Sequence, residues 1–233
     1  MRLRHNNNYF IAKGIPMKKR LQALLFALAL TSTSSILHAE GSIDAGKEKA
    51  ALCFSCHGEN GNSLVSNFPK LAQQNSSYLV KQLQAYKNGT RKNAMMSGIV
   101  AGLSDDDMSD IAAYFADQDI SSNQLPNLDD DDEDDNKKDI HAIMAQGSDL
   151  YRNGDLPREV SACIACHGPF GEGNKPATFP SIKSQHADYL IQTLTDFKTG
   201  ARSNNPENMM HMIAKKMTDD EIKAVSYHIS MMK

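Results

Sequence analysis

The residues best suited to chemistry are cysteines and histidines in a repeated pattern. Residues 53–57 read Cys-Phe-Ser-Cys-His and residues 163–167 read Cys-Ile-Ala-Cys-His, so the two segments use all 4 cysteines. Two cysteines three positions apart present both sulfurs on one side of a helical turn. Cys-x-x-Cys-His is the attachment pattern of c-type haem, whose vinyl groups form thioethers with the thiols while the histidine ligates the iron. The pattern therefore predicts two covalently attached haems.

Three other interpretations use the same residues. A thioredoxin-like dithiol needs Cys-x-x-Cys but no histidine directly after it. Structural zinc needs four ligands in a closed set, and its cysteine pairs commonly lie only about 15–20 residues apart. Disulfides suit an exported protein but explain neither the histidines nor the repetition. Haem attachment is therefore favoured, with thioether candidates Cys53, Cys56, Cys163 and Cys166 and iron-ligand candidates His57 and His167.

The rest of the chain repeats in the same order. A duplicated module with small loop insertions explains this constant order. The sequence therefore predicts two homologous domains, residues 40–120 and 140–233. The matching landmarks are Phe68-Pro69 with Phe179-Pro180, Tyr78-Leu79 with Tyr189-Leu190, Gly89-Thr-Arg91 with Gly200-Ala-Arg202, and Met95-Met96 with Met209-Met210.

A sixth ligand to each iron should recur in both halves, downstream of the histidine. A thioether sulfur opposite histidine raises the potential of haem iron, which suits electron transfer. The pairs Met95-Met96 and Met209-Met210 recur, whereas the counterpart of Met212 is Gly98. Because methionine in a helical protein is usually a core residue, one member of each pair is expected to ligate iron and the other to pack.

Both halves show helical periodicity and no convincing strand alternation, so the expected fold class is all-α, with two tandem domains related by duplication. Ser/Thr-x-x-acid capping boxes predict helices that start after Ser104 and Thr218. Two further apolar stripes end before Gly89 and Gly200, since glycine commonly terminates a helix. The helices predicted to open the two domains span residues 44–52 and 140–152.

Residues 121–139 are predicted to link the domains. They contain seven consecutive acidic residues, 129–135, which repel one another and include no apolar side chain to bury. A calcium loop would need a glycine and spaced ligands that this run lacks. A solvated linker is therefore favoured.

Residues 1–39 are predicted to be a cleaved export signal, which places the protein in the periplasm. The basic group Lys18-Lys19-Arg20 precedes the uncharged apolar stretch 21–30, which is shorter than the ~20 residues that span a bilayer. Met17 directly precedes this group and is a second candidate start. Residues 1–39 hold six basic and no acidic side chains, so the remainder has 19 basic and 28 acidic ones and a net charge of −9. That balance argues against a nucleic-acid partner, which needs a clustered positive surface.

Together these residues resemble the dihaem cytochrome c4 family, over nearly all of residues 42–233 apart from the linker. The resemblance implies two class I cytochrome c folds whose haems face each other across the domain interface. It implies a monomeric electron carrier, peripheral to the membrane, that passes electrons from a quinol-oxidising complex to a terminal oxidase. These redox proteins would be its partners.

The resemblance also assigns individual residues. It implies Met96 and Met210 as the axial methionines. It implies that the carbonyls of Pro69 and Pro180 accept a hydrogen bond from the ligating histidines, which fixes the orientation of each imidazole. Two arginines at matching positions fit either contacts with the haem propionates or solvated surface: Arg91 and Arg202. Rival iron ligands are His186, His228 and, directly after one candidate methionine, His211.

Three function classes compete. An electron carrier needs two closed iron sites, which one methionine per half provides. A dihaem enzyme, peroxidase-like or thiosulfate-oxidising, needs an open or labile iron position or a ligand such as cysteine, and no cysteine remains after two attachments. A haem-based sensor would need an attached signalling domain. The carrier is therefore the favoured function.

Overall fold

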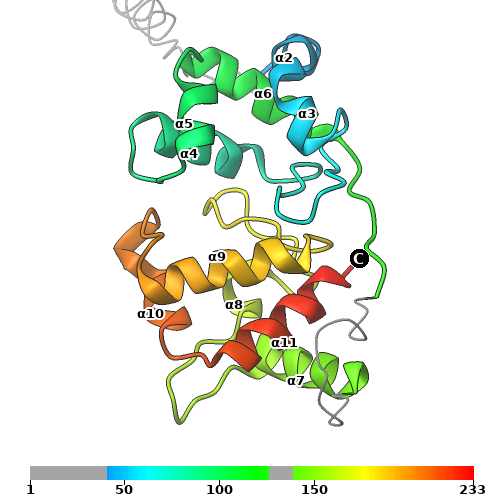
Figure 1. The fold of residues 1–233 in the computed structure, drawn as a ribbon, viewed down its shortest axis with the longest axis vertical. Helices are drawn as coiled ribbons and strands as arrows, with labels where there is room; N and C mark the ends of the chain where they lie inside the picture. The colour runs from blue at the N-terminus through cyan, green and yellow to red at the C-terminus, as the bar shows by residue number, and fades with distance from the viewer. Residues whose placement is uncertain (1–40, 126–138) are drawn as a thin grey trace, which may run out of the picture. The chain divides into compact units, whose positions relative to one another are not determined.

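Each repeat folds as a series of helices in the same order (Figure 1). An opening helix leads to the Cys-x-x-Cys-His turn, and then come a long helix, a short methionine-bearing helix and a terminal helix. In the first repeat these are α2 (Ile43–Lys49), η1 (Ala50–Cys53), α3 (Phe54–His57), α4 (Ser76–Lys87), α5 (Ala94–Val100) and α6 (Asp105–Asp117). In the second they are α7 (Ile140–Asn153), α8 (Ile164–His167), α9 (Ala187–Thr199), η2 (Pro206–Asn208), α10 (Met209–Ala214) and α11 (Asp219–Ser230).

This computed structural model describes residues 41–125 and 139–233, and both repeats belong to one compact unit within it. The predicted export signal and the acidic run 129–135 lie outside the described residues. Within the described ranges the only extended pairings are isolated bridges at Asp155–Val160 and Asn174–Phe179, so the predicted all-α class is confirmed. None of the helices in these ranges is long and apolar enough to cross a membrane.

The predicted capping boxes are present at both terminal helices. The Ser104 hydroxyl accepts a hydrogen bond from the backbone N–H of Asp107, whose carboxylate accepts one from the Ser104 N–H in return. Thr218 and Glu221 form the same pair at the start of α11. Such reciprocal bonds satisfy N–H groups that the first helical turn leaves without partners.

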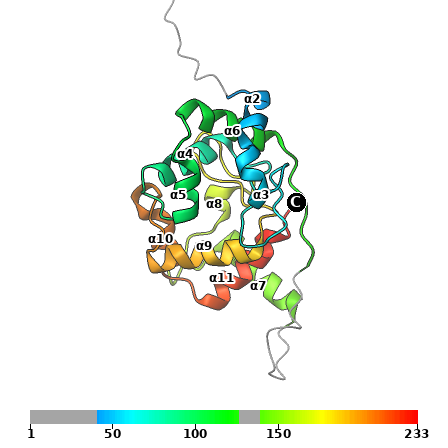
Figure 2. The same ribbon diagram turned by 45° about the horizontal axis from the view of Figure 1, so that its top comes forward.

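In each repeat the opening helix crosses the terminal helix closely, α2 against α6 and α7 against α11 (Figures 1 and 2). Glycine at the crossing permits this approach. A Cβ at Gly46 would lie 2.0 Å from the carbonyl oxygen of Asp110, and one at Gly147 would lie 2.1 Å from that of Ala224. The crossing holds the opening helix from which the chain runs into the cysteine turn.

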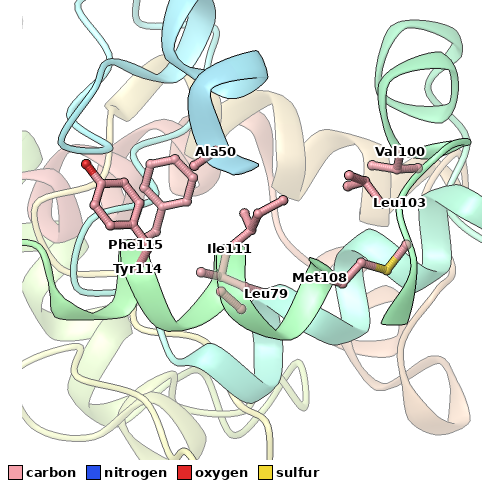
Figure 3. Close-up of a cluster of buried hydrophobic side chains, with 9 residues drawn as sticks. Ala50, Leu79, Val100, Leu103, Met108, Ile111, Tyr114 and Phe115 are labelled. Carbon is pink, nitrogen blue, oxygen red and sulfur yellow. The ribbon is translucent and has the colours of Figure 1, made fainter. Parts of the chain in front are cut away.

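The terminal helices are the largest contributors to each core. Figure 3 shows Met108 and Ile111 on α6, with Leu79 from α4 beside them. Ile222 and Val225 on α11 occupy the same role in the second repeat. These are the apolar stripes that periodicity predicted, and burying each such side chain contributes roughly 1.5–3 kcal/mol.

Candidate haem-binding sites

Each cysteine pair lies on a short helical turn that ends at the histidine. Cys53 ends η1 and Cys56 lies in α3, while Cys163 precedes α8 and Cys166 lies in it. All these cysteines are free and half-buried. The turn then stops at a glycine with φ +79° in the first repeat, where a Cβ would meet the carbonyl oxygen of Asn62 at 2.7 Å. The first cysteine of each pair, Cys53 or Cys163, packs against the core of its repeat.

The first thiol of each pair is a poor match for a redox dithiol. Burial raises the pKa of the Cys53 thiol to about 11, and burial does the same for Cys163. Catalytic dithiols have lowered thiol pKa values, because the thiolate is the nucleophile. In the described ranges no group of three or more His, Cys, Asp or Glu side chains is placed to hold a metal ion. The closed four-ligand zinc site therefore has no counterpart in that part of the chain.

Both histidines are buried and are oriented by a proline carbonyl. His57 Nδ1 lies 2.8 Å from the carbonyl oxygen of Pro69, and His167 Nδ1 lies 3.0 Å from that of Pro180. A carbonyl oxygen only accepts, so Nδ1 carries the proton and Nε2 carries the lone pair that a metal needs. Burial lowers the pKa of both rings, and the bond to the proline only partly opposes this. Each ring is therefore held neutral with Nε2 available for ligation.

The structure separates the two methionines of each pair. Met96 is half-buried and packs against the first core, whereas Met95 is 57% exposed. Met210 is half-buried and Met209 is exposed. The backbone N–H of Met96 donates to the side chain of Asn93, the N-cap of α5, and that of Met210 donates to the side chain of Asn205. Met96 and Met210 are thus equivalent and are the more sheltered member of each pair.

Two of the three rival histidines, His211 and His186, have hydrogen-bond partners. His211 Nδ1 donates to the carbonyl oxygen of Phe197 at 2.7 Å. At the equivalent place in the first repeat, the Ser97 hydroxyl donates to the carbonyl oxygen of Tyr86 at 3.0 Å, so His211 fills a structural position. His186 Nε2 lies 2.9 Å from the hydroxyl of Ser63. The His228 ring packs against Tyr151 in a tilted arrangement with the centroids 5.7 Å apart, and its buried Nε2 has no hydrogen-bond partner in the described residues.

Arg91 and Arg202 are not solvated surface residues. Each donates to a tyrosine of the other repeat, Arg91 to Tyr189 at 3.0 Å and Arg202 to Tyr78 at 2.9 Å. Both also donate to the amide oxygen of Gln82, at 2.9 and 3.0 Å. Neither guanidinium forms an ion pair with a carboxylate in residues 41–125 or 139–233.

Arg202 is buried and Arg91 half-buried, and two such positive charges that converge without an acidic side chain make a strongly positive site. Burial opposes ionisation of Tyr189, yet the charges of Arg91 and Arg202 outweigh it and lower the pKa of its hydroxyl. A bound group that brings its own carboxylates, as haem does through its propionates, fits this donor set. The residues present thus fit haem at the cysteines, at the histidines and at the arginines.

Sequence reasoning did not single out two glutamines that join the repeats. The side chain of Gln74 bonds to the backbone of Ser181, and that of Gln185 bonds to the backbone of Lys70. The sequence does contain a signal. The two glutamines are 111 residues apart, and so are their partners Lys70 and Ser181 and the two prolines that accept from the histidines.

Comparison with known proteins matches the cytochrome c family model to residues 43–119 and 144–233. Cytochrome c4 of Azotobacter vinelandii is 42% identical over 223 residues, which cover 91% of this chain and 98% of that protein. A protein of Thiomonas intermedia described as a thiosulfate dehydrogenase electron acceptor is 33% identical over 183 residues, 78% of this chain and 79% of that one. The crystal structure of reduced recombinant cytochrome c4 from Pseudomonas stutzeri matches with a TM-score of 0.75 and 39% identity, covering 83% of this chain and 100% of that chain.

Proposed function

The chain belongs to the cytochrome c4 family, and on this premise we propose that it is a periplasmic protein that passes single electrons between redox proteins. It carries two covalently bound c-type haems in two tandem cytochrome c domains. When bound, each haem supplies an iron that alternates between the ferric and ferrous states. The protein's own contribution is to bind the two haems, to supply ligands to their irons and to shield them from solvent.

Each repeat has candidate residues for every task. Cys53, Cys56, Cys163 and Cys166 would hold the haems through thioethers. His57 and His167 would ligate iron through Nε2, since Nδ1 is bonded to a proline carbonyl. Met96 and Met210 would be the opposite ligands, and Arg91 and Arg202 would neutralise the propionates.

The single observation that carries the proposal is the recurrence of a half-buried methionine in both repeats, Met96 and Met210, beside a more exposed one. If these methionines ligate iron opposite the histidines, neither iron would keep an open position for a substrate. An enzyme of the peroxidase or thiosulfate-oxidising kind needs such a position. The relative from Thiomonas intermedia is itself described as an electron acceptor, which supports a carrier role for proteins of this length.

We further propose that residues 1–39 are a cleaved export signal and that residues 121–139 link domains 40–120 and 140–233. The donor would be a quinol-oxidising complex and the acceptor a terminal oxidase, as the resemblance implies. The protein would act as a monomer at the membrane periphery. Stopped-flow reduction by membranes with an active quinol-oxidising complex, and by thiosulfate dehydrogenase with thiosulfate, would rank the two donor classes.

The deciding experiment is a redox titration of the exported holoprotein, followed by visible spectroscopy, with carbon monoxide added to the reduced form. Two reversible one-electron steps, a methionine-to-iron charge-transfer band and no binding of carbon monoxide are expected. High-spin character or carbon monoxide binding at either haem would reject the carrier and favour the enzyme.

A further inference from the structure

One peptide group in each repeat takes part in two hydrogen bonds. Its carbonyl accepts from the candidate ligand histidine of the same repeat, and its N–H donates to a glutamine of the other repeat. The carbonyl of Pro69 accepts from His57 Nδ1 at 2.8 Å. The N–H of the same peptide group belongs to Lys70 and donates to Gln185 Oε1 at 2.9 Å. A peptide group is conjugated, so its carbonyl and its N–H polarise together. The buried histidine of the first repeat is thus linked through a single peptide group to a side chain of the second.

The second repeat mirrors this arrangement. The carbonyl of Pro180 accepts from His167 Nδ1 at 3.0 Å, and the Ser181 N–H of the same peptide group donates to Gln74 Oε1 at 2.8 Å. The two connections are crossed. The glutamine of each repeat serves the histidine of the other.

The glutamine side chains are held firmly in these positions. Gln185 and Gln74 are only 5% and 8% exposed. Gln185 Nε2 donates to the carbonyl oxygen of Lys70 at 2.9 Å, and Gln74 Nε2 donates to that of Ser181 at 2.7 Å. This second bond fixes which amide atom is the oxygen, because a carbonyl cannot donate. Each peptide N–H therefore meets an acceptor with one defined orientation in a buried site.

A hydrogen bond at the N–H of a peptide group makes its carbonyl oxygen a better acceptor, since bonded chains strengthen each member by roughly 10–30%. A better acceptor at the proline draws the Nδ1 proton of the histidine more strongly and makes Nε2 a more basic ligand. A more basic ligand favours the ferric state and lowers the reduction potential of the iron that it binds.

We propose that Gln185 is a positioning residue for His57 and that Gln74 is one for His167, so that each domain tunes the haem of the other. This inference rests on the proposed assignment of the two histidines as iron ligands. Removal of a glutamine acceptor should change the reduction equilibrium of the opposite haem by about two- to threefold, toward the reduced form. For one electron this corresponds to a rise of about 18–28 mV, since tenfold corresponds to 59 mV.

The test is a redox titration followed by NMR on the full-length holoprotein, with each haem assigned through contacts to its own domain. Gln185→Met should raise the potential of the haem at residues 53–57 and leave the other unchanged, and Gln74→Met should do the reverse. Ser77→Ala is the matched control, because the Ser77 hydroxyl makes an exposed bond of 2.8 Å to the Lys175 carbonyl of the other repeat and touches neither proline. Equal shifts of both haems, or a shift in the glutamine's own domain, would overturn the proposal.

A conservative variant separates tuning from simple docking. Gln185→Glu keeps an oxygen acceptor for the Lys70 N–H, so it should restore the potential of the first haem or lower it further. If the glutamine only holds the repeats together, Gln185→Glu and Gln185→Met should shift the potentials alike, which would reject the proposal. The proposed function is checked separately on the unmodified protein, since absence of the methionine-to-iron band there would reject the axial methionines and the closed iron sites, and not the role of the glutamines.

Discussion

Substitution of one glycine by alanine should have opposite effects at two helical positions of the first domain. Alanine stabilises a helix interior by about 1 kcal/mol relative to glycine. At Gly46 the added Cβ would lie 2.0 Å from the carbonyl oxygen of Asp110, a backbone atom that cannot rotate away. Helices α2 and α6 would have to separate by about 1 Å or more, because Cβ atoms do not approach closer than 3.0 Å. Such overpacking costs about 1–3 kcal/mol and can cost more.

Separation of α2 from α6 would also weaken bonds to the Asp110 carboxylate, which accepts from the Ser42 N–H at 2.7 Å and from the Lys49 ammonium at 2.6 Å. These losses and the overpacking outweigh the gain in helix propensity, so we expect Gly46→Ala to destabilise the first domain by about 2 kcal/mol. Gly98 in α5 has no atom within 4 Å of its ideal Cβ. The second repeat has Met212 at the equivalent place. Gly98→Ala should therefore stabilise by about 0.5–1 kcal/mol.

Guanidinium unfolding of the two holoprotein variants, followed by the haem absorption, measures the difference directly. A gap of about 3 kcal/mol in the free energy of unfolding, with opposite signs, is expected. Gly147→Ala should repeat the loss in the second domain, where the Cβ would meet the carbonyl oxygen of Ala224 at 2.1 Å. If Gly46→Ala also stabilised the protein, as Gly98→Ala is expected to do, the close crossing of α2 and α6 would be refuted.

Three further outcomes are expected. Met96→Leu should open the first haem to carbon monoxide while Met95→Leu leaves it closed, as absorption spectra of the reduced variants would show; closure in both would reassign the ligand. Replacing Cys53 and Cys56 by alanine should leave the first domain largely unfolded, since a domain of this size has a marginal core without haem; retained native circular dichroism would contradict this. Burial lowers the pKa of the half-buried His186, a hydrogen bond to Ser63 and the charge of Asp188 oppose the shift, and Lys70 reinforces it. The unfolded state then takes up the proton first, so the contribution of His186 to stability should be constant above pH 6.5 and be lost below it, with a smaller slope in His186→Asn measured by unfolding across pH.

Local patterns in the sequence predicted most of the individual repeat. The capping residues Ser104 and Thr218 form the expected boxes, because the side chain and the N–H that it accepts lie within one turn. The proline carbonyls at Pro69 and Pro180 bind the histidines as the family resemblance implied. The opening helix was expected over residues 44–52, and the chain instead tightens to a 3-10 helix after Lys49.

The contacts between repeats could not be predicted in this way. The sequence was compatible with two environments for Arg91 and Arg202, contact with the haem propionates or exposure to solvent. A single sequence does not show which distant residues pack against a side chain, so it could not decide between them. Their tyrosine partners lie 98 and 124 residues away in the chain. Gln74 and Gln185 carry no local pattern at all, and only the duplicated spacing marks them as a pair.

Duplication of the ligands does not make the two haem environments equal, because the residues around them break the repeat. Lys70 is 3% exposed, and its ammonium donates to the Ser121 carbonyl oxygen and to Asn123 Oδ1, both at 2.7 Å, while the equivalent residue in the second repeat is the uncharged Ser181. Arg91 and Arg202 converge on one shared acceptor, Gln82, rather than on one in each repeat. A buried positive charge favours the less positive, ferrous iron, and screening by water is weak at such a site. The two haem sites therefore differ in their electrostatic surroundings even where the candidate ligands repeat, because the buried charge of Lys70 has no counterpart at Ser181.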